Sequence, residues 1–179
     1  MVTQEIIIET ELVNEANRML NELKQAKGLL ENVPTSTSGV SEEGIPSLIK
    51  ALNLVIGARK RVKNLEKFAK TLFGILASLR RKMNSPRRLS REFILSTLKR
   101  DKGALLQSQE RKVIEGAYYI EMWLRHAISS LEHAIEFLEK MFHGRADRKV
   151  KEVLECLSLA IEGVERILAL QIKIKEEYF

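Results

Sequence analysis

The chain of 179 residues is long enough for one well-buried domain, and its hydrophobic content of 45% is ordinary for a globular protein. The single cysteine excludes an internal disulfide framework and a cysteine-based metal cluster, and it favours a reducing, cytoplasmic environment. No stretch approaches the roughly 20 apolar residues of a membrane span, and the first residues lack the cationic start of a signal peptide. Charge dominated by Glu, Lys and Arg also favours a thermophilic source.

The net charge of +6 conceals an uneven distribution along the chain. Residues 1–58 carry a net charge of −4, and residues 113–179 carry −3. Residues 59–112 hold 17 Lys and Arg against 4 Asp and Glu, which is a net charge of +13. The positive surplus is therefore confined to the middle third, which indicates a localised cationic surface.

Apolar residues recur at alternating steps of three and four along most of the chain, which predicts helices. The first helix is expected over about residues 3–32, and Pro34 opens a loop rich in Pro, Gly and small hydroxyl residues. The second is expected over about 47–84, with Pro46 in its first turn and Pro86 just beyond its end.

A short amphipathic helix is expected over about residues 87–100, with a break at Gly103. The third long helix is expected over about 104–142, with Met141 as its last seam residue, and the fourth over about 147–176. The predicted seam of the fourth helix consists of Val150, Leu154, Leu157, Ile161, Val164 and Leu168. A mean spacing of 3.5 residues is typical of coiled-coil-like packing. The sequence therefore predicts a single all-α domain over residues 1–179, an elongated antiparallel bundle of four long helices plus the short one.

The cationic residues of the second helix lie away from its seam positions, which are a and d of the heptad. Lysines at positions f and b form a stripe roughly 15 Å long, and arginines gather where the helix ends. Phosphates along a nucleic-acid strand could contact several of these groups at once, with release of counterions. The candidate nucleic-acid-binding residues are Lys60, Lys63, Lys67, Lys70, Arg80, Arg81, Arg87, Arg88 and Arg91.

Three explanations of this surplus compete. Nucleic acid could neutralise it through phosphate contacts that are independent of sequence. The acidic first and fourth helices, or an acidic partner protein, could neutralise it instead. The basic amphipathic segment 65–82 could also lie on an acidic membrane surface, although its apolar residues continue the seam and are explained first by burial in the core.

An aromatic cluster is the second candidate feature. Tyr118 and Tyr119 fall at positions b and c of the third long helix, and Trp123 falls at g, so the two tyrosines are expected to be partly exposed. Exposed rings could stack on bases or anchor a protein interface. Equally, Tyr and Trp often cover the flank of a bundle with their polar ends in water.

Catalytic chemistry finds little support in the register. His126, His133, His143 and Cys156 fall at outward positions c and f, whereas the metal sites of helical bundles need ligands that point into the core. Glu136 with Glu139, and Glu152 with Glu155, have the spacing with which bundle-type nucleoside triphosphate pyrophosphohydrolases bind Mg²⁺. All four also fall on the outer face, where Lys140, Lys149 and Lys151 can pair with them, so ordinary solvated helix faces are favoured.

We therefore expect a non-enzymatic, nucleic-acid-binding protein that contacts DNA or RNA phosphates through its basic middle third, as part of a larger assembly. No catalytic residue, metal or cofactor is expected. The alternative is a protein-binding adaptor or a dimerising helical scaffold without a nucleic-acid role.

Overall fold

Four long helices account for nearly all of the chain in the computed structural model, which describes residues 2–83 and 92–178. Side chains are described for residues 11–71, 73, 74, 108 and 110–170. The helices are α1 (Val2–Glu31), α2 (Ile45–Met83), α3 (Glu92–Glu139) and α4 (His143–Tyr178). The predicted all-α bundle is confirmed, and Pro46 lies in the first turn of α2, where its missing N–H group costs no hydrogen bond.

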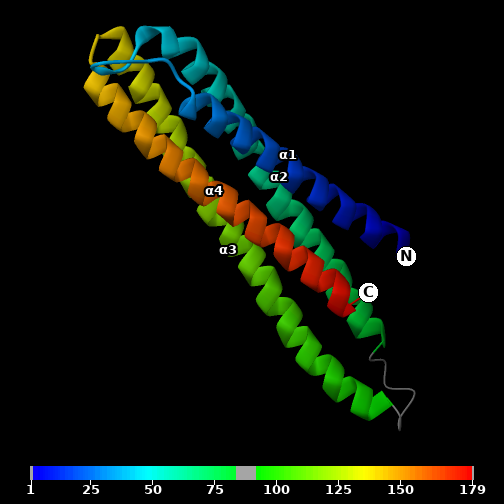
Figure 1. Cartoon of the computed structure of the whole chain (residues 1–179). Coiled ribbons are helices and arrows are strands. Elements are labelled where there is room, and N and C mark those ends of the chain that lie inside the picture. The colour runs from blue at the N-terminus through cyan, green and yellow to red at the C-terminus, as the bar shows by residue number, and fades with distance from the viewer. Residues whose placement is uncertain (1, 84–91, 179) are drawn as a thin grey trace.

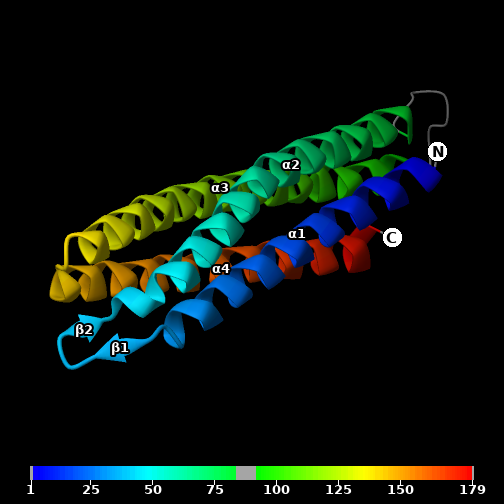
Figure 2. The ribbon, with the colours of Figure 1, turned by 90° about the horizontal axis from the view of Figure 1, so that it is seen from above.

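The helices run up and down along one long axis (Figure 1). Each packs against its neighbours in the chain, and α4 also packs against α1, so that α2 and α4 lie diagonally across the bundle (Figure 2). The start of α1 and the end of α4 lie at one end of the rod. The connection between α1 and α2 and the turn between α3 and α4 lie at the other. The two helices with outward lysines or tyrosines, α2 and α3, are therefore adjacent.

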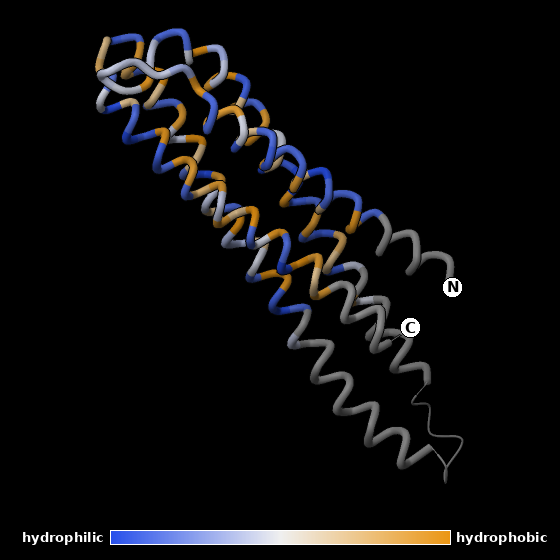
Figure 3. Tube along the Cα trace, in the orientation of Figure 1, coloured by the Kyte–Doolittle hydropathy of each residue, from blue (hydrophilic) through white to orange (hydrophobic). Residues whose placement is uncertain are grey.

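The core is a continuous apolar seam shared by all four helices. Hydrophobic and hydrophilic residues alternate along each helix with the helical period (Figure 3). The apolar residues that recur at steps of three and four are buried from Leu12 to Leu30 in α1, from Val55 to Ala69 in α2 and from Val113 to Leu138 in α3. This burial fixes the rotation of each helix, and with it the side chains that face water.

A small hairpin closes one end of the bundle where the sequence predicted only a loop. Strands β1 (Thr35–Ser36) and β2 (Gly39–Val40) pair antiparallel and lead into a 3₁₀ turn over Glu42–Gly44. Gly39 has a φ of 123°, and a Cβ atom there would lie 2.9 Å from the carbonyl oxygen of His143. The Nδ1 of His143 donates a hydrogen bond of 3.0 Å to the carbonyl of Val40. The hairpin is thereby fixed to the start of α4, and His143 is partly buried rather than fully outward as predicted.

The predicted short helix over residues 87–100 is wrong as a separate element. Residues 87–91 lie outside the described part of the chain, and from Glu92 onward a single helix continues to Glu139. Gly103 does not interrupt it. One glycine in a helix costs only about 1 kcal/mol relative to alanine, and no proline follows to remove a backbone donor.

Two predictions about seam positions are also wrong. Met141 is 62% exposed with a φ of 66°, because α3 ends at Glu139 and the chain reverses through a left-handed residue. In α4 the fully buried seam runs through Val153, Ala160 and Ile167, whereas Leu154 and Leu168 are only partly buried. Each of these seam residues is followed by a second apolar residue, so hydrophobicity alone does not choose between them.

Glycines set this rotation of α4 by bringing α3 and α4 close together. A Cβ atom at Gly163 would lie 2.8 Å from Cγ1 of Ile120, and one at Gly116 would lie 3.4 Å from Ile167. The two isoleucines thus pack reciprocally against the backbone of the facing helix. At Gly163 this distance leaves no room for an added methyl group unless Ile120 shifts.

Gly163→Ala is expected to destabilise the bundle by about 1–3 kcal/mol, because the added methyl group overpacks the contact with Ile120. Gly28→Ala in α1 is the matched control, because no atom lies within 4 Å of its added Cβ. This control is expected to raise the free energy of unfolding by about 0.5–1 kcal/mol through helix propensity. Chemical denaturation of both variants measures the difference, and an equal effect of the two substitutions would contradict the close approach of α3 and α4.

Candidate nucleic-acid-binding surface

Helix α2 is the helix with the clearest excess of positive charge. It holds ten Lys and Arg residues against one glutamate, a net charge of +9 over Ile45–Met83. Its cations fall into two groups according to their position in the heptad. Among the described side chains, Arg59 and Arg61 flank the seam and face neighbouring helices, whereas the lysines occupy the outer positions.

The arginines beside the seam are neutralised inside the bundle. Arg61 donates hydrogen bonds to Glu22 and Glu15 of α1, with an N–O distance of 3.3 Å to Glu15. The hydrogen bond to Glu22 is the main cause that raises the pKa of Arg61 above its usual value. Planar guanidinium groups suit this bidentate, shared pairing with carboxylates better than ammonium groups do.

A second network joins α2 to α3. The carboxylate of Glu121 accepts hydrogen bonds from Arg59 of α2 at 3.0 Å and from Arg125 of α3 at 2.9 Å. Burial opposes ionisation of Glu121, but the hydrogen bonds from Arg125 and Arg59 outweigh it and lower the pKa of the carboxyl group. One carboxylate thus forms ion pairs with two arginines at the α2–α3 boundary.

The four stripe lysines all lie on the solvent face of α2, as the register predicts. Lys60, Lys63, Lys67 and Lys70 are exposed. Lys70 pairs with Glu66 at 2.8 Å within the same helix. No carboxylate among the described side chains lies within ion-pair distance of the other three lysines. Glu15 and Glu22 of α1 pair with Arg61 instead, and α4 lies diagonally across the bundle from the stripe.

The predicted arginine cluster after the stripe falls on parts that the structure does not describe. Arg80 and Arg81 belong to α2, but their side chains are outside the described set. Arg87, Arg88 and Arg91 lie outside the described residues altogether. The continuity of the cluster with the lysine stripe stays a prediction.

The aromatic residues of α3 are exposed as expected, but they lie on two sides of the helix. Tyr118 is 66% exposed and Tyr119 is 56% exposed, and their rings meet edge to face with centroids 5.8 Å apart. Tyr119 lines a groove with a volume of about 420 Å³ between α3 and α4. Tyr118 lies three residues before Glu121, on the side of α3 that faces α2.

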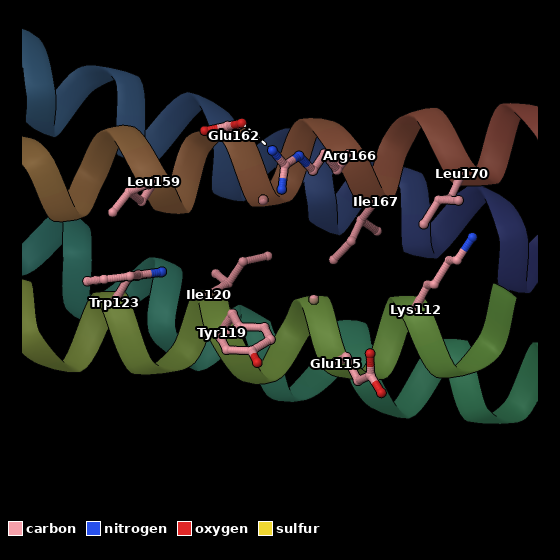
Figure 4. Close-up of a pocket in the computed structure, with 12 residues that line it drawn as sticks. Lys112, Glu115, Tyr119, Ile120, Trp123, Leu159, Glu162, Arg166, Ile167 and Leu170 are labelled. Carbon is pink, nitrogen blue, oxygen red and sulfur yellow. Dashed lines mark hydrogen bonds and ion pairs between the residues drawn. The ribbon is translucent and has the colours of Figure 1, made fainter. Parts of the chain in front are cut away.

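Figure 4 shows the α3–α4 groove, whose apolar lining includes Tyr119, Trp123 and Leu159 together with Ile120, Ile167 and Leu170. Trp123 is partly buried, and Leu159 is 41% exposed. Glu115 of α3 and Arg166 of α4 stand on opposite rims, and Arg166 pairs with Glu162 of its own helix. The groove is therefore an apolar strip with charges of both signs along its edges.

The glutamate pairs considered for Mg²⁺ are exposed and lie beside lysines. Glu136 pairs with Lys140 at 2.7 Å, and Glu152 pairs with Lys149 at 3.0 Å, whereas Lys151 pairs with Asp147 instead. Within the described residues, no group of three or more His, Cys, Asp or Glu side chains is arranged to hold a metal ion.

Cys156 is buried and not outward as predicted, because the α4 seam passes through Val153. Burial, and then the nearby Glu152 and Glu155, raise the pKa of its thiol. A raised pKa lowers the thiolate fraction, and this disfavours nucleophilic chemistry at this cysteine.

The described helices include none with an apolar stretch long enough to cross a membrane. Comparison with protein-family models, with curated proteins and with solved structures finds no significant match to this chain.

Sequence reasoning missed the pairing of Arg59 and Arg61, which it counted as part of the positive surplus. The two arginines occupy heptad positions that flank the seam. The glutamates Glu15, Glu22 and Glu121 occupy flanking positions of the neighbouring helices. These opposite charges predict the ion pairs once the order of the helices around the bundle is known.

The ion pairs around Glu121 are expected to stabilise the fold in a pH-dependent way. Above about pH 4.3, the ordinary glutamate pKa, the carboxylate is ionised in both states, and the network contributes fully. As the pH falls through the lower pKa of the folded state, this contribution is lost. Glu121→Gln is expected to cost about 1 kcal/mol at neutral pH, and this cost is expected to shrink as the pH falls further below about 4.3.

Denaturant unfolding across this pH range measures the effect. Glu132→Gln is the matched control, since Glu132 is an exposed glutamate of the same helix that forms no ion pair with the described side chains. A Glu121→Gln penalty that stays constant down to pH 3 would show that the pairs contribute nothing.

Proposed function

We propose that this protein binds nucleic acid through phosphate contacts made by the outer lysines of α2 and acts without catalysing a reaction. The observation that carries the proposal is the difference between arginines and lysines within one helix. Arg59 and Arg61 are paired with carboxylates of adjacent helices. Lys60, Lys63 and Lys67 are exposed and lack an acidic partner among the described side chains.

The arrangement of these lysines suits a polyanion better than it suits the folded chain alone. Seven residues of helix place Lys60 and Lys67 about 10.5 Å apart, with Lys63 between them. Three like charges on one rigid line repel one another unless an anion with repeating charge lies along them. A nucleic-acid backbone supplies this repeat, and its binding releases condensed counterions, which favours association at low salt.

The first experiment measures how affinity for mixed-sequence DNA and RNA depends on salt. For three phosphate contacts, the association constant is expected to fall roughly 20- to 40-fold between about 50 and about 200 mM salt. The triple variant Lys60→Gln, Lys63→Gln, Lys67→Gln is expected to weaken binding at low salt. It should also reduce the slope of log affinity against log salt by about two to three, because each lysine neutralises one phosphate.

The matched control removes three charges from other faces of the bundle. Lys24, Lys140 and Lys151 are exposed but paired with Glu165, Glu136 and Asp147, so their replacement by Gln gives the same net charge without touching the stripe. The control is expected to keep most of the slope. Equal loss in the two triple variants would indicate a diffuse charge effect and contradict a site on α2.

A dimerising scaffold is the second candidate function, and the α3–α4 groove is the observation that favours it. Gly116 lies level with Ile167 in the groove, so Glu115 and Arg166 lie at nearly the same height on opposite rims. A second copy related by a twofold axis parallel to the helices would bring Glu115 of each copy against Arg166 of the other. The same operation would cover the exposed surface of Tyr119 and Leu159.

Leu159→Glu is expected to disrupt this dimer without unfolding the bundle, because the side chain lies at an exposed position on the groove rim. Sedimentation velocity over a range of protein concentrations measures the change in mass. A wild-type protein that stays monomeric at all concentrations would rule out the dimer and leave the proposed nucleic-acid site untouched.

A further inference from the structure

We infer that the preferred ligand is single-stranded nucleic acid, with a base stacked on Tyr118 of α3 while the adjacent phosphates contact the lysines of α2. The inference rests on the proposed function and specifies which class of nucleic acid the site takes. It depends on the position of one exposed aromatic ring relative to the cationic stripe.

The ion pair between Arg59 and Glu121 fixes the register between α2 and α3. Lys63 lies four residues after Arg59, and Tyr118 lies three residues before Glu121. The two helices are antiparallel, so the step from Arg59 to Lys63 and the step from Glu121 to Tyr118 run in the same direction along the bundle. The first step covers about 6 Å and the second about 4.5 Å. Lys63 and Tyr118 therefore stand at nearly the same height on neighbouring helices, both at the outer edge of the α2–α3 boundary.

The cationic surface also extends onto α3. Arg111 lies two helical turns before Tyr118 on the same face and is exposed. It lies ten residues before Glu121, and Lys70 lies eleven residues after Arg59, so Arg111 stands level with Lys70. On the other side of Tyr118, Arg125 lies one turn beyond Glu121. Tyr118 is thus an aromatic ring between two arginines of α3, beside the lysine row of α2.

This combination distinguishes single strands from duplexes. Base faces in a duplex are covered by stacking on their neighbours, whereas an unpaired base can offer a face to a tyrosine ring. Tyr118 is 66% exposed, and the edge-to-face contact with Tyr119 supports its ring from one side. A strand that places phosphates along Lys60, Lys63 and Lys67 could therefore turn one base onto Tyr118. Stacking of this kind tolerates any base, which agrees with binding independent of sequence.

The experiment compares an oligothymidylate of about 16 nucleotides with a mixed-sequence duplex of the same length, at low salt. The wild-type protein is expected to bind the single strand more tightly. Tyr118→Leu is expected to weaken single-strand binding by about 5- to 150-fold, the range for loss of one stacked base, and to leave duplex binding unchanged. Tyr118→Phe keeps the ring and is expected to keep the affinity.

Phe142→Leu is the matched control, because this aromatic ring is also exposed but lies in the turn between α3 and α4, away from Tyr118. Ultraviolet cross-linking with 5-iodouracil in the single strand, followed by peptide mapping, is expected to label Tyr118. If neither nucleic acid binds the wild-type protein at low salt, the proposed function itself is wrong. If both bind equally and Tyr118→Leu has no effect, the single-strand preference is wrong and phosphate binding stands.

Discussion

Burial of the heptad seam is the constraint on which every other feature of this protein depends. A seam with a mean spacing of 3.5 residues must face the bundle axis along the whole helix, so it fixes how each helix is rotated. Rotation in turn decides which charges meet across helices and which meet water. The reciprocal packing of Ile120 on Gly163 and of Ile167 on Gly116 adds a second constraint, since it sets the distance between α3 and α4.

The fixed rotation sorts the cations of α2 by chemistry. Among the described side chains, the guanidinium groups of Arg59 and Arg61 occupy the flanking positions, where carboxylates of neighbouring helices accept their hydrogen bonds in partly desolvated space. Ammonium groups, which are strongly hydrated, occupy the outer positions where that hydration is kept. The same helix therefore stabilises the bundle with one set of cations and leaves another set available for an external anion.

The sequence alone was sufficient to predict the bundle and the outward lysines, because apolar periodicity encodes both. Prediction from the sequence failed where alternative local structures have nearly the same free energy. Gly103 does not end a helix by itself, and the apolar pairs that begin at Val153, Ala160 and Ile167 leave the α4 seam undecided. The pairing of Arg61 with Glu15 and Glu22 depends on contacts between residues 39 or more apart, which periodicity within one helix does not contain. The hairpin over Thr35–Val40 depends similarly on His143 of α4, which only tertiary packing brings to Gly39 and Val40.

Under the proposed function, the shared carboxylate of Glu121 would affect which anions bind at the α2–α3 boundary. Two guanidinium groups around one carboxylate leave the cluster with a formal charge of +1. Arg125 can turn from Glu121 towards an arriving anion, and Arg59 still keeps the carboxylate compensated. Glu121 is then an internal competitor that any external ligand of Arg125 must displace. A monovalent anion that displaces Glu121 from Arg125 replaces one ion pair by another and gains little binding free energy. A polyanion that already contacts the protein elsewhere competes for Arg125 at a high effective concentration.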